Sequence, residues 1–113
     1  MMQTIRLTWP SADASPNARG HWAKRARANK TMRQAAFYLA KAANLTAPEG
    51  DIHVRLTFYA PDRRHYDVDN LQARAKAYLD GIADALKVND RMFRPTSTIA
   101  PELGGYVEVE IAG

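Results

Sequence analysis

The chain has 113 residues, of which 46% are apolar and 25% are charged, and it carries a net charge of +4 and no cysteine. These values are ordinary for one folded domain and exclude a disordered tail, a collagen-like repeat and a coiled-coil rod. Without cysteine the chain has no disulfide, no thiol nucleophile and no cysteine zinc site. No apolar run approaches the roughly 20 residues that span a bilayer, and no signal peptide is visible, so we expect a cytoplasmic protein that does not enter the membrane.

Positive charge is concentrated in the first part of the chain. Residues 1–47 contain eight Lys or Arg and one Asp, a net charge of +7, whereas residues 48–113 contain eight bases and eleven acids, a net charge of −3. A basic segment of this kind fits a polyanionic partner such as nucleic acid. Chance clustering of charge on a solvated surface is the alternative interpretation.

The first part of the chain predicts a strand, a loop and a helix. Apolar and polar residues alternate over residues 3–9, which predicts a strand that Pro10 ends, and turn-forming residues fill 10–20. The basic segment 21–30 is either a first helical turn or a mobile arm. Apolar residues at spacings of three and four then predict a helix from about Asn29 to Asn44. Its expected buried face is Met32, Ala35, Ala36, Leu39, Ala42 and Ala43.

The second part predicts a strand, a helix and two further strands. Apolar residues alternate over residues 52–60, which is the clearest strand pattern in the chain. An apolar stripe predicts a helix from about Asn70 to Leu86, with Asp69 and Gln72 as a capping box. A short strand at 96–100 and a last strand at 107–111 are close enough to form a hairpin.

This order of elements, β-α-β-α-(β)-β, indicates the fold class. Strands that alternate with helices predict an α/β (α+β) fold, in which two main helices pack on a small mixed sheet. No linker, repeat or low-complexity segment interrupts the chain, so we expect a single domain over residues 1–113.

Two aspartates precede the second predicted helix. Asp67 and Asp69 are two residues apart, so in an extended segment their carboxylates point the same way, while Val68 points toward the core. Two adjacent carboxylates repel each other unless a cation joins them, and Mg²⁺ takes carboxylate and phosphate oxygens. The segment is therefore a candidate site for metal and phosphate together. Alternatively, Asp69 is only a helix cap, and Asp67 is only a loop acid or a partner of Arg64.

Asp90 and Lys76 extend this candidate site. Asp90 lies in a charged loop after the second helix, and the chain has to return along the sheet if Asp90 is to meet Asp67. Lys76 lies about one and a half turns into the helix, where a fixed cation would stabilise negative charge developing on a phosphate. The alternatives are a turn residue for Asp90 and a surface lysine near Asp80 for Lys76.

Basic side chains supply candidate contacts to DNA. They would hold the phosphate backbone without reading the base sequence. Trp22, which lies among cations, either stacks on a base or packs on the core. The candidate DNA-binding residues are Asn17, Arg19, Lys24, Arg25, Arg27, Lys30, Arg63 and Arg64.

The segment Arg63-Arg64-His65-Tyr66-Asp67-Val68-Asp69-Asn70-Leu71-Gln72 resembles the central motif of the RusA family of Holliday junction resolvases. That family carries Asp-x-Asp-Asn-Leu after a basic run, then a lysine in the helix and a third aspartate beyond it. Leu7-Thr8-Trp9-Pro10 followed by Ser15-Pro16-Asn17 is similar to the family's early Pro-Ser-Asn segment. Two positions depart from the pattern, since Ala73 stands where the family lysine usually falls and Asn89 stands where an acid often precedes the third aspartate.

The resemblance implies a Mg²⁺-dependent endodeoxyribonuclease, with Mn²⁺ as a second possible cofactor. Such an enzyme cleaves branched DNA, chiefly four-way junctions, in recombination and repair, and works as a homodimer in bacteria, phages or prophages. By position, Asp67, Asp69 and Asp90 match the catalytic metal ligands. Lys76 lies one turn beyond the position of the family lysine, so it either replaces that lysine as the auxiliary cation or is unrelated to it. Two other functions stay open: a non-catalytic DNA-binding module on the same fold, and a metal-dependent RNA nuclease.

Overall fold

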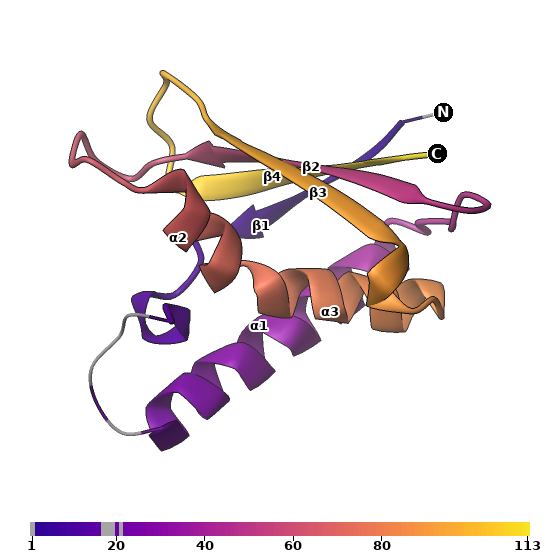
Figure 1. Ribbon diagram of the computed structural model, residues 1–113, viewed down its shortest axis with the longest axis horizontal. Helices are drawn as coiled ribbons and strands as arrows, with labels where there is room; N and C mark the ends of the chain where they lie inside the picture. The colour runs from indigo at the N-terminus through magenta and orange to yellow at the C-terminus, as the bar shows by residue number, and fades with distance from the viewer. Residues whose placement is uncertain (1, 17–19, 21) are drawn as a thin grey trace.

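A four-stranded mixed sheet forms the centre of the computed structural model, which describes residues 2–16, 20 and 22–113 (Figure 1). The strands lie in the order β1-β4-β2-β3. β4 pairs antiparallel with both β1 and β2, and β3 pairs parallel with β2. Their bounds are Gln3–Thr8 for β1, Ile52–Tyr59 for β2, Phe93–Ile99 for β3 and Tyr106–Ala112 for β4. Together with the helices, this sheet confirms the predicted α+β class.

The last two strands do not form the predicted hairpin. β4 lies between β1 and β2, with Val109 opposite both Ile5 and Leu56, whereas β3 pairs with β2 at the edge of the sheet. The reason is the residue composition of each strand. The inward residues of β4 are all apolar and fully buried, which suits a central strand, while β3 contains Pro95, which suits an edge strand.

Three α-helices cover one face of the sheet (Figure 1). They are α1 (Trp22–Ala42), α2 (Val68–Arg74) and α3 (Lys76–Leu86), with short 3₁₀ turns at Ala12–Ala14 and Asp90–Met92. The core lies between the helices and the alternate residues of the strands. The predicted alternation in β2 is confirmed, because its inward residues are at most 1% exposed: Ile52, Val54, Leu56 and Phe58.

Helix α1 begins earlier than predicted. The basic segment that was left open between a helical turn and an arm is helical from Trp22 onward. Alanine, lysine and arginine are strong helix formers, so the segment is helical although none of its residues is fully buried and Ala28 is only partly buried against the core. The buried residues of α1 are Met32, Ala36 and Ala40. The broader predicted face is wrong in part, since Ala35, Leu39, Ala42 and Ala43 are exposed. Trp22 is 76% exposed, so the alternative in which it packs on the core is also wrong.

The predicted helix from Asn70 to Leu86 is in fact two helices. Ala75, with φ −83° and ψ 0°, lies between the end of α2 and the start of α3. No helix-breaking residue at this position indicates the break in the sequence. The predicted capping box is also wrong. Asp67, not Asp69, caps α2, and the side chain of Gln72 accepts a hydrogen bond of 2.5 Å from the Ser97 hydroxyl instead of reaching the cap.

Helices α1 and α3 pack closely against each other, and a glycine permits it. A Cβ on Gly81 would lie 2.2 Å from the Arg33 carbonyl oxygen and 2.9 Å from the Ala36 Cβ. An exposed ion pair also joins the two helices: Arg33 of α1 donates from Nε and Nη2 to the Asp84 carboxylate of α3 at 2.6 and 2.9 Å. None of the described helices is long and apolar enough to cross a membrane.

Candidate nucleic-acid interface

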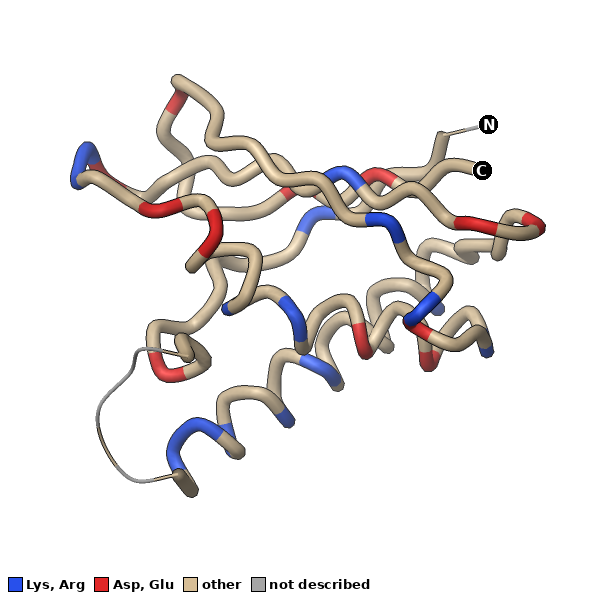
Figure 2. Tube along the Cα trace, in the orientation of Figure 1, with Lys and Arg blue, Asp and Glu red and all other residues tan. Residues whose placement is uncertain are grey.

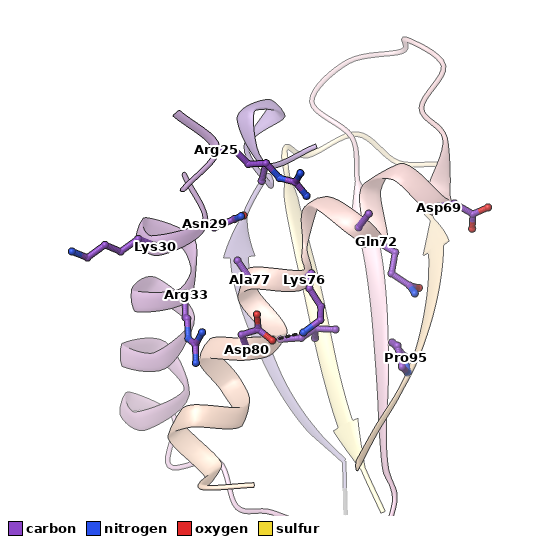
Figure 3. Close-up of a pocket in the computed structure, with 13 residues that line it drawn as sticks. Arg25, Asn29, Lys30, Arg33, Asp69, Gln72, Lys76, Ala77, Asp80 and Pro95 are labelled. Atoms are coloured by element: carbon purple, nitrogen blue, oxygen red, sulfur yellow. Dashed lines mark hydrogen bonds and ion pairs between the residues drawn. The ribbon is translucent and has the colours of Figure 1, made fainter. Parts of the chain in front are cut away.

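A groove of about 880 Å³ runs between α1 on one side and α2 and α3 on the other (Figure 3). Charged and amide side chains supply most of its functional groups, and cations outnumber acids. The groove therefore presents a polar, net positive surface, which is the property that a phosphate backbone requires. Its lining residues are Ala14, Arg25, Asn29, Lys30, Arg33, Asp69, Gln72, Ala73, Lys76, Ala77, Leu79, Asp80 and Pro95.

Helix α1 provides one wall of the groove. Arg25, Asn29 and Arg33 follow each other at spacings of four residues, which places them on one side of the helix at intervals of about 6 Å. Lys30 lies beside them. The basic residues of α1 continue along the helix toward its N-terminal end, as Figure 2 shows in blue. This wall thus repeats hydrogen-bond donors along its length, an arrangement suited to an extended polyanion.

Lys76 lies at the first turn of α3, opposite this wall. Its ammonium donates to the Asp80 carboxylate and, at 2.7 Å, to Asp90 Oδ2 (Figure 3 shows the Asp80 contact). The contact with Asp90 joins residues 14 apart, because the loop after α3 turns back before β3 begins. The chain therefore brings Asp90 to Lys76. The sequence-based alternative for Lys76, an ion pair with Asp80 one turn along the helix, is also present.

These contacts keep Lys76 charged. Partial burial by itself lowers the pKa of the Lys76 ammonium, but the hydrogen bonds and charges of Asp80 and Asp90 outweigh it and raise the pKa above its usual value. The hydrogen bond from Lys76 in turn lowers the pKa of the Asp90 carboxyl. The three side chains therefore form one network with a net charge of −1, of which Lys76 and Asp80 line the groove.

A second hollow of about 400 Å³ adjoins the groove and shares Arg33, Lys76 and Asp80 with it. Its other polar residues are Asp84, Asn89 and Asp90. The hydrogen bonds between Arg33 and Asp84 raise the pKa of the guanidinium and lower the pKa of the carboxyl. Positive and negative side chains alternate here, so this hollow is less favourable to an anion than the α1 wall.

Asp67 and Asp69 do not point the same way, contrary to the sequence prediction. The chain becomes helical at Val68, and residues two apart on a helix project to nearly opposite sides. Asp67 Oδ1 accepts hydrogen bonds from the backbone N–H groups of Asp69 at 2.9 Å and Asn70 at 3.4 Å. Asp69 instead lines the groove, at the end where α2 begins. The sequence alternatives placed the helix cap at Asp69 and paired Asp67 with Arg64, whereas the cap is Asp67 and Arg64 pairs with Asp62.

The predicted metal ligands therefore occupy three different settings. Asp67 caps α2, Asp69 lines the groove, and Asp90 is bound to Lys76. Within residues 2–16, 20 and 22–113, no group of three or more His, Asp or Glu side chains lies where it would hold a metal ion. The three carboxylates as arranged here do not form one group, so we derive no step through a shared Mg²⁺ or Mn²⁺ ion.

The predicted DNA-binding residues lie in two regions. Lys24, Arg25, Arg27 and Lys30 are exposed on the first half of α1, and two of them line the groove. Arg63 and Arg64 are exposed in the loop before α2. Arg64 donates to the Asp62 carboxylate at 2.7 Å, and these hydrogen bonds lower the pKa of Asp62 to about 2. The candidates Asn17 and Arg19 lie outside the described residues.

Four polar residues of the groove are not among the candidate site residues predicted from the sequence: Asn29, Arg33, Gln72 and Asp80. Asn29 and Arg33 follow Arg25 at spacings of four, a signal that the sequence contains but that needs the full length of α1 to be recognised. Gln72 was assigned to a cap, and Asp80 was considered only as an alternative partner of Lys76. Their placement depends on the break at Ala75, for which the sequence gives no local signal.

Fold and groove together define a small α+β protein with a basic, phosphate-compatible cleft. No family model matches the chain. An uncharacterized protein of Xylella fastidiosa (strain Temecula1) is 44% identical to it over 118 residues, which cover 99% of this chain and 77% of that protein. The chain belongs to the same family as this bacterial protein.

Proposed function

We propose that the protein is a structure-specific endodeoxyribonuclease of the RusA type, which binds the phosphate backbone of branched DNA in the basic groove and cleaves it beside Lys76. One observation carries the proposal. Lys76 and Asp69 come from the RusA-like segment and its helix, Arg25 and Lys30 come from α1, and all four line the same groove. Motif residues and backbone-binding cations that are far apart in the sequence thus share one surface.

The side chains would divide the work between binding and charge stabilisation. The cations of α1 neutralise phosphates and release counterions, which gives affinity without base specificity. Lys76 is a fixed cation, oriented by Asp80 and Asp90, that stabilises negative charge on the phosphate under attack. Asp80 and Asp90 act as positioning residues for the ammonium.

The proposal includes Mg²⁺ or Mn²⁺ as the cofactor that the resemblance implies. A divalent ion supplies neutralisation of phosphate charge and activation of water in such reactions. We assign it no ligand geometry, because the described residues hold no group of three ligands.

A homodimer is the third part of the proposal. Resolution of a junction requires cuts in two opposed strands, and a two-fold dimer presents two equivalent sites to them. The mass in solution by light scattering tests this, with twice the chain mass expected. Since the substrate is DNA and the relative is bacterial, we propose that the protein acts in the bacterial cytoplasm.

A cleavage assay on a synthetic four-way junction tests the activity. We expect nicking in Mg²⁺ or Mn²⁺ that is abolished by Asp69→Asn and reduced at least tenfold by Lys76→Met. Lys41→Met, which changes an exposed lysine at the end of α1, is the matched control and should cleave normally. Intact flap, junction and duplex DNA over a range of both ions would falsify the enzymatic part. Cleavage of RNA but not DNA would instead identify an RNA nuclease.

A non-catalytic DNA-binding module is the second candidate, and the absence of a three-ligand group among the described residues favours it. It uses the same groove. It predicts salt-sensitive binding without cleavage, and binding that Asp67→Asn or Asp69→Asn leaves intact or strengthens through loss of negative charge.

A further inference from the structure

Helix α2 separates two differently lined hollows. Asp69, Gln72 and Lys76 face the groove already described. Asp67, Asn70 and Arg74, spaced by three and four residues, line another hollow of about 430 Å³. The wall between the two is thus one short helix whose opposite sides carry different functional groups.

The hollow beside Asp67, Asn70 and Arg74, called the Arg74 hollow below, contains a buried positive charge, that of Arg74. It is only 8% exposed, and it is the one charged residue that is buried in the described part of the chain. Its Nε donates to the Ser11 carbonyl at 3.2 Å and its Nη2 to the Pro10 carbonyl at 2.5 Å. Nη1 has no hydrogen-bond acceptor among the described residues, and no described Asp or Glu forms an ion pair with the guanidinium. Arg74 is therefore a buried cation without a counterion.

Burial without a counterion has a measurable consequence. Loss of hydration lowers the pKa of the Arg74 guanidinium, in contrast to Arg33 and Arg64, whose carboxylate partners raise theirs. Buried charges in proteins are usually paired with an opposite charge or used in binding and catalysis. The carbonyls of Pro10 and Ser11 hold Arg74 in place, and its Cζ lies 5.9 Å from the centroid of the Trp9 ring, but no described carboxylate neutralises its charge.

The remaining lining of the hollow offers further polar groups. His65 and Ser15 lie at its edge, and Asn70 donates from Nδ2 to the Ser15 hydroxyl at 2.8 Å. The carboxylate of Asp67 is the one acid in this lining, and one of its oxygens is held by the first amides of α2. Guanidinium groups bind phosphate, like carboxylate, through paired coplanar N–H donors.

We propose that the Arg74 hollow binds a phosphate group of DNA, so that α2 lies between two strands of a branched substrate, one in the basic groove and the other against Arg74. This inference rests on the proposed function, which it deepens by assigning a second strand-binding site. It also explains the preference for branched DNA: a single strand fills only one of the two sites, whereas a junction presents strands to both sides of the helix.

The first test is direct binding to the intact protein. Inorganic phosphate is titrated against protein with ¹⁵N-labelled arginine side chains, with chloride at equal ionic strength as the reference. We expect the Arg74 Nε–H resonance to shift with phosphate and not with chloride. Equal shifts with both anions, or no shift, would overturn the proposal.

The second test uses one variant that should strengthen binding and one that should weaken it, because unfolding of the protein could only weaken binding. Asp67→Asn keeps a good N-cap residue and removes the one acid of the hollow, and it should tighten phosphate binding about threefold or more. His65→Gln, in an exposed loop position, should weaken junction binding severalfold and leave single-strand binding unchanged. Arg74→Lys should abolish the phosphate response.

The two proposals fail separately. If neither junction nor single strand binds and Lys30→Gln has no effect, the proposed function fails, whatever phosphate does at Arg74. If both DNAs bind and Lys30→Gln weakens both, while His65→Gln and Asp67→Asn change neither, the groove is a DNA site and the second-strand proposal is wrong.

Discussion

The two halves of α1 have the same backbone conformation but differ in burial and charge. From Trp22 to Thr31 no residue is buried, and the segment carries Lys24, Arg25, Arg27 and Lys30. From Met32 to Ala42 every fourth residue is buried against the rest of the molecule. In Figure 1 the first half projects away from the sheet, and the second half lies along α3. Helix formation therefore continues past the core, and we attribute the overhanging half to binding rather than packing.

The largest expected effect is on the packed half. Gly81→Ala places a methyl group 2.2 Å from the Arg33 carbonyl oxygen, which is backbone and cannot move without shifting α1. We expect a loss of about 3 kcal/mol of folding free energy, the upper part of the range for overpacking. Urea denaturation measures it.

The matched control adds more volume to the overhanging half. Ala26→Leu introduces three carbons at an exposed position with a residue of high helix propensity, so the free energy of unfolding should change by less than about 0.5 kcal/mol. A comparable loss at both positions would show that the first half of α1 is also packed, against something outside the single chain.

The second prediction concerns DNA binding, which changes in the overhanging half of α1 should affect more than changes in the packed half. Replacement of Lys24, Arg25, Arg27 and Lys30 by Gln should leave stability nearly unchanged and weaken DNA binding strongly. Each phosphate contact that is lost should reduce the slope of log K against log salt by about 0.9. Fluorescence anisotropy at several salt concentrations measures the slope.

Lys41 provides the control for this charge change, because it is an exposed lysine on the packed half. Lys41→Gln should leave both the affinity and its salt dependence close to those of the parent protein. An effect per charge equal to that of the overhanging half would mean that net charge alone drives binding, and that the groove has no special role.

The sequence predicts the packed parts of the fold better than the exposed ones. Strand β2 is predicted within one residue, because its alternation reports burial directly. The sequence does not decide where α1 starts, because helices are predicted from a periodic apolar face and Trp22–Thr31 has none. The parallel pairing of β3 with β2 was not predicted, because the order of strands in a sheet depends on how all strands and helices pack together and not on the local sequence of β3.

The same limit applies to the candidate site. Asp67, Asp69 and Lys76 were chosen from local spacing, and the structure places two of them in one groove. The relation between Asp67 and Asp69 was predicted wrongly because it depends on whether helix starts before or after Val68. Arg74 is buried by the loop at residues 10–11, a contact between residues more than 60 apart that local spacing does not predict.

The smallest expected effect lies at the boundary between the halves of α1, where Arg33 is paired with Asp84. Both side chains are about half exposed, at 52% and 41%, so solvent screening limits the pair to under about 1 kcal/mol of stability. Asp84→Asn should lose that amount at neutral pH. The folded-state pKa of Asp84 is lowered, so the contribution is present above the ordinary aspartate pKa of about 3.9 and is lost as the pH falls through the lowered value. Denaturation curves of parent and variant should therefore differ at pH 7 and converge below about pH 3. A difference that persists in acid would mean that the Asp84 carboxyl group contributes by packing rather than by charge, and that the packed half of α1 needs no ion pair where it meets the overhanging half.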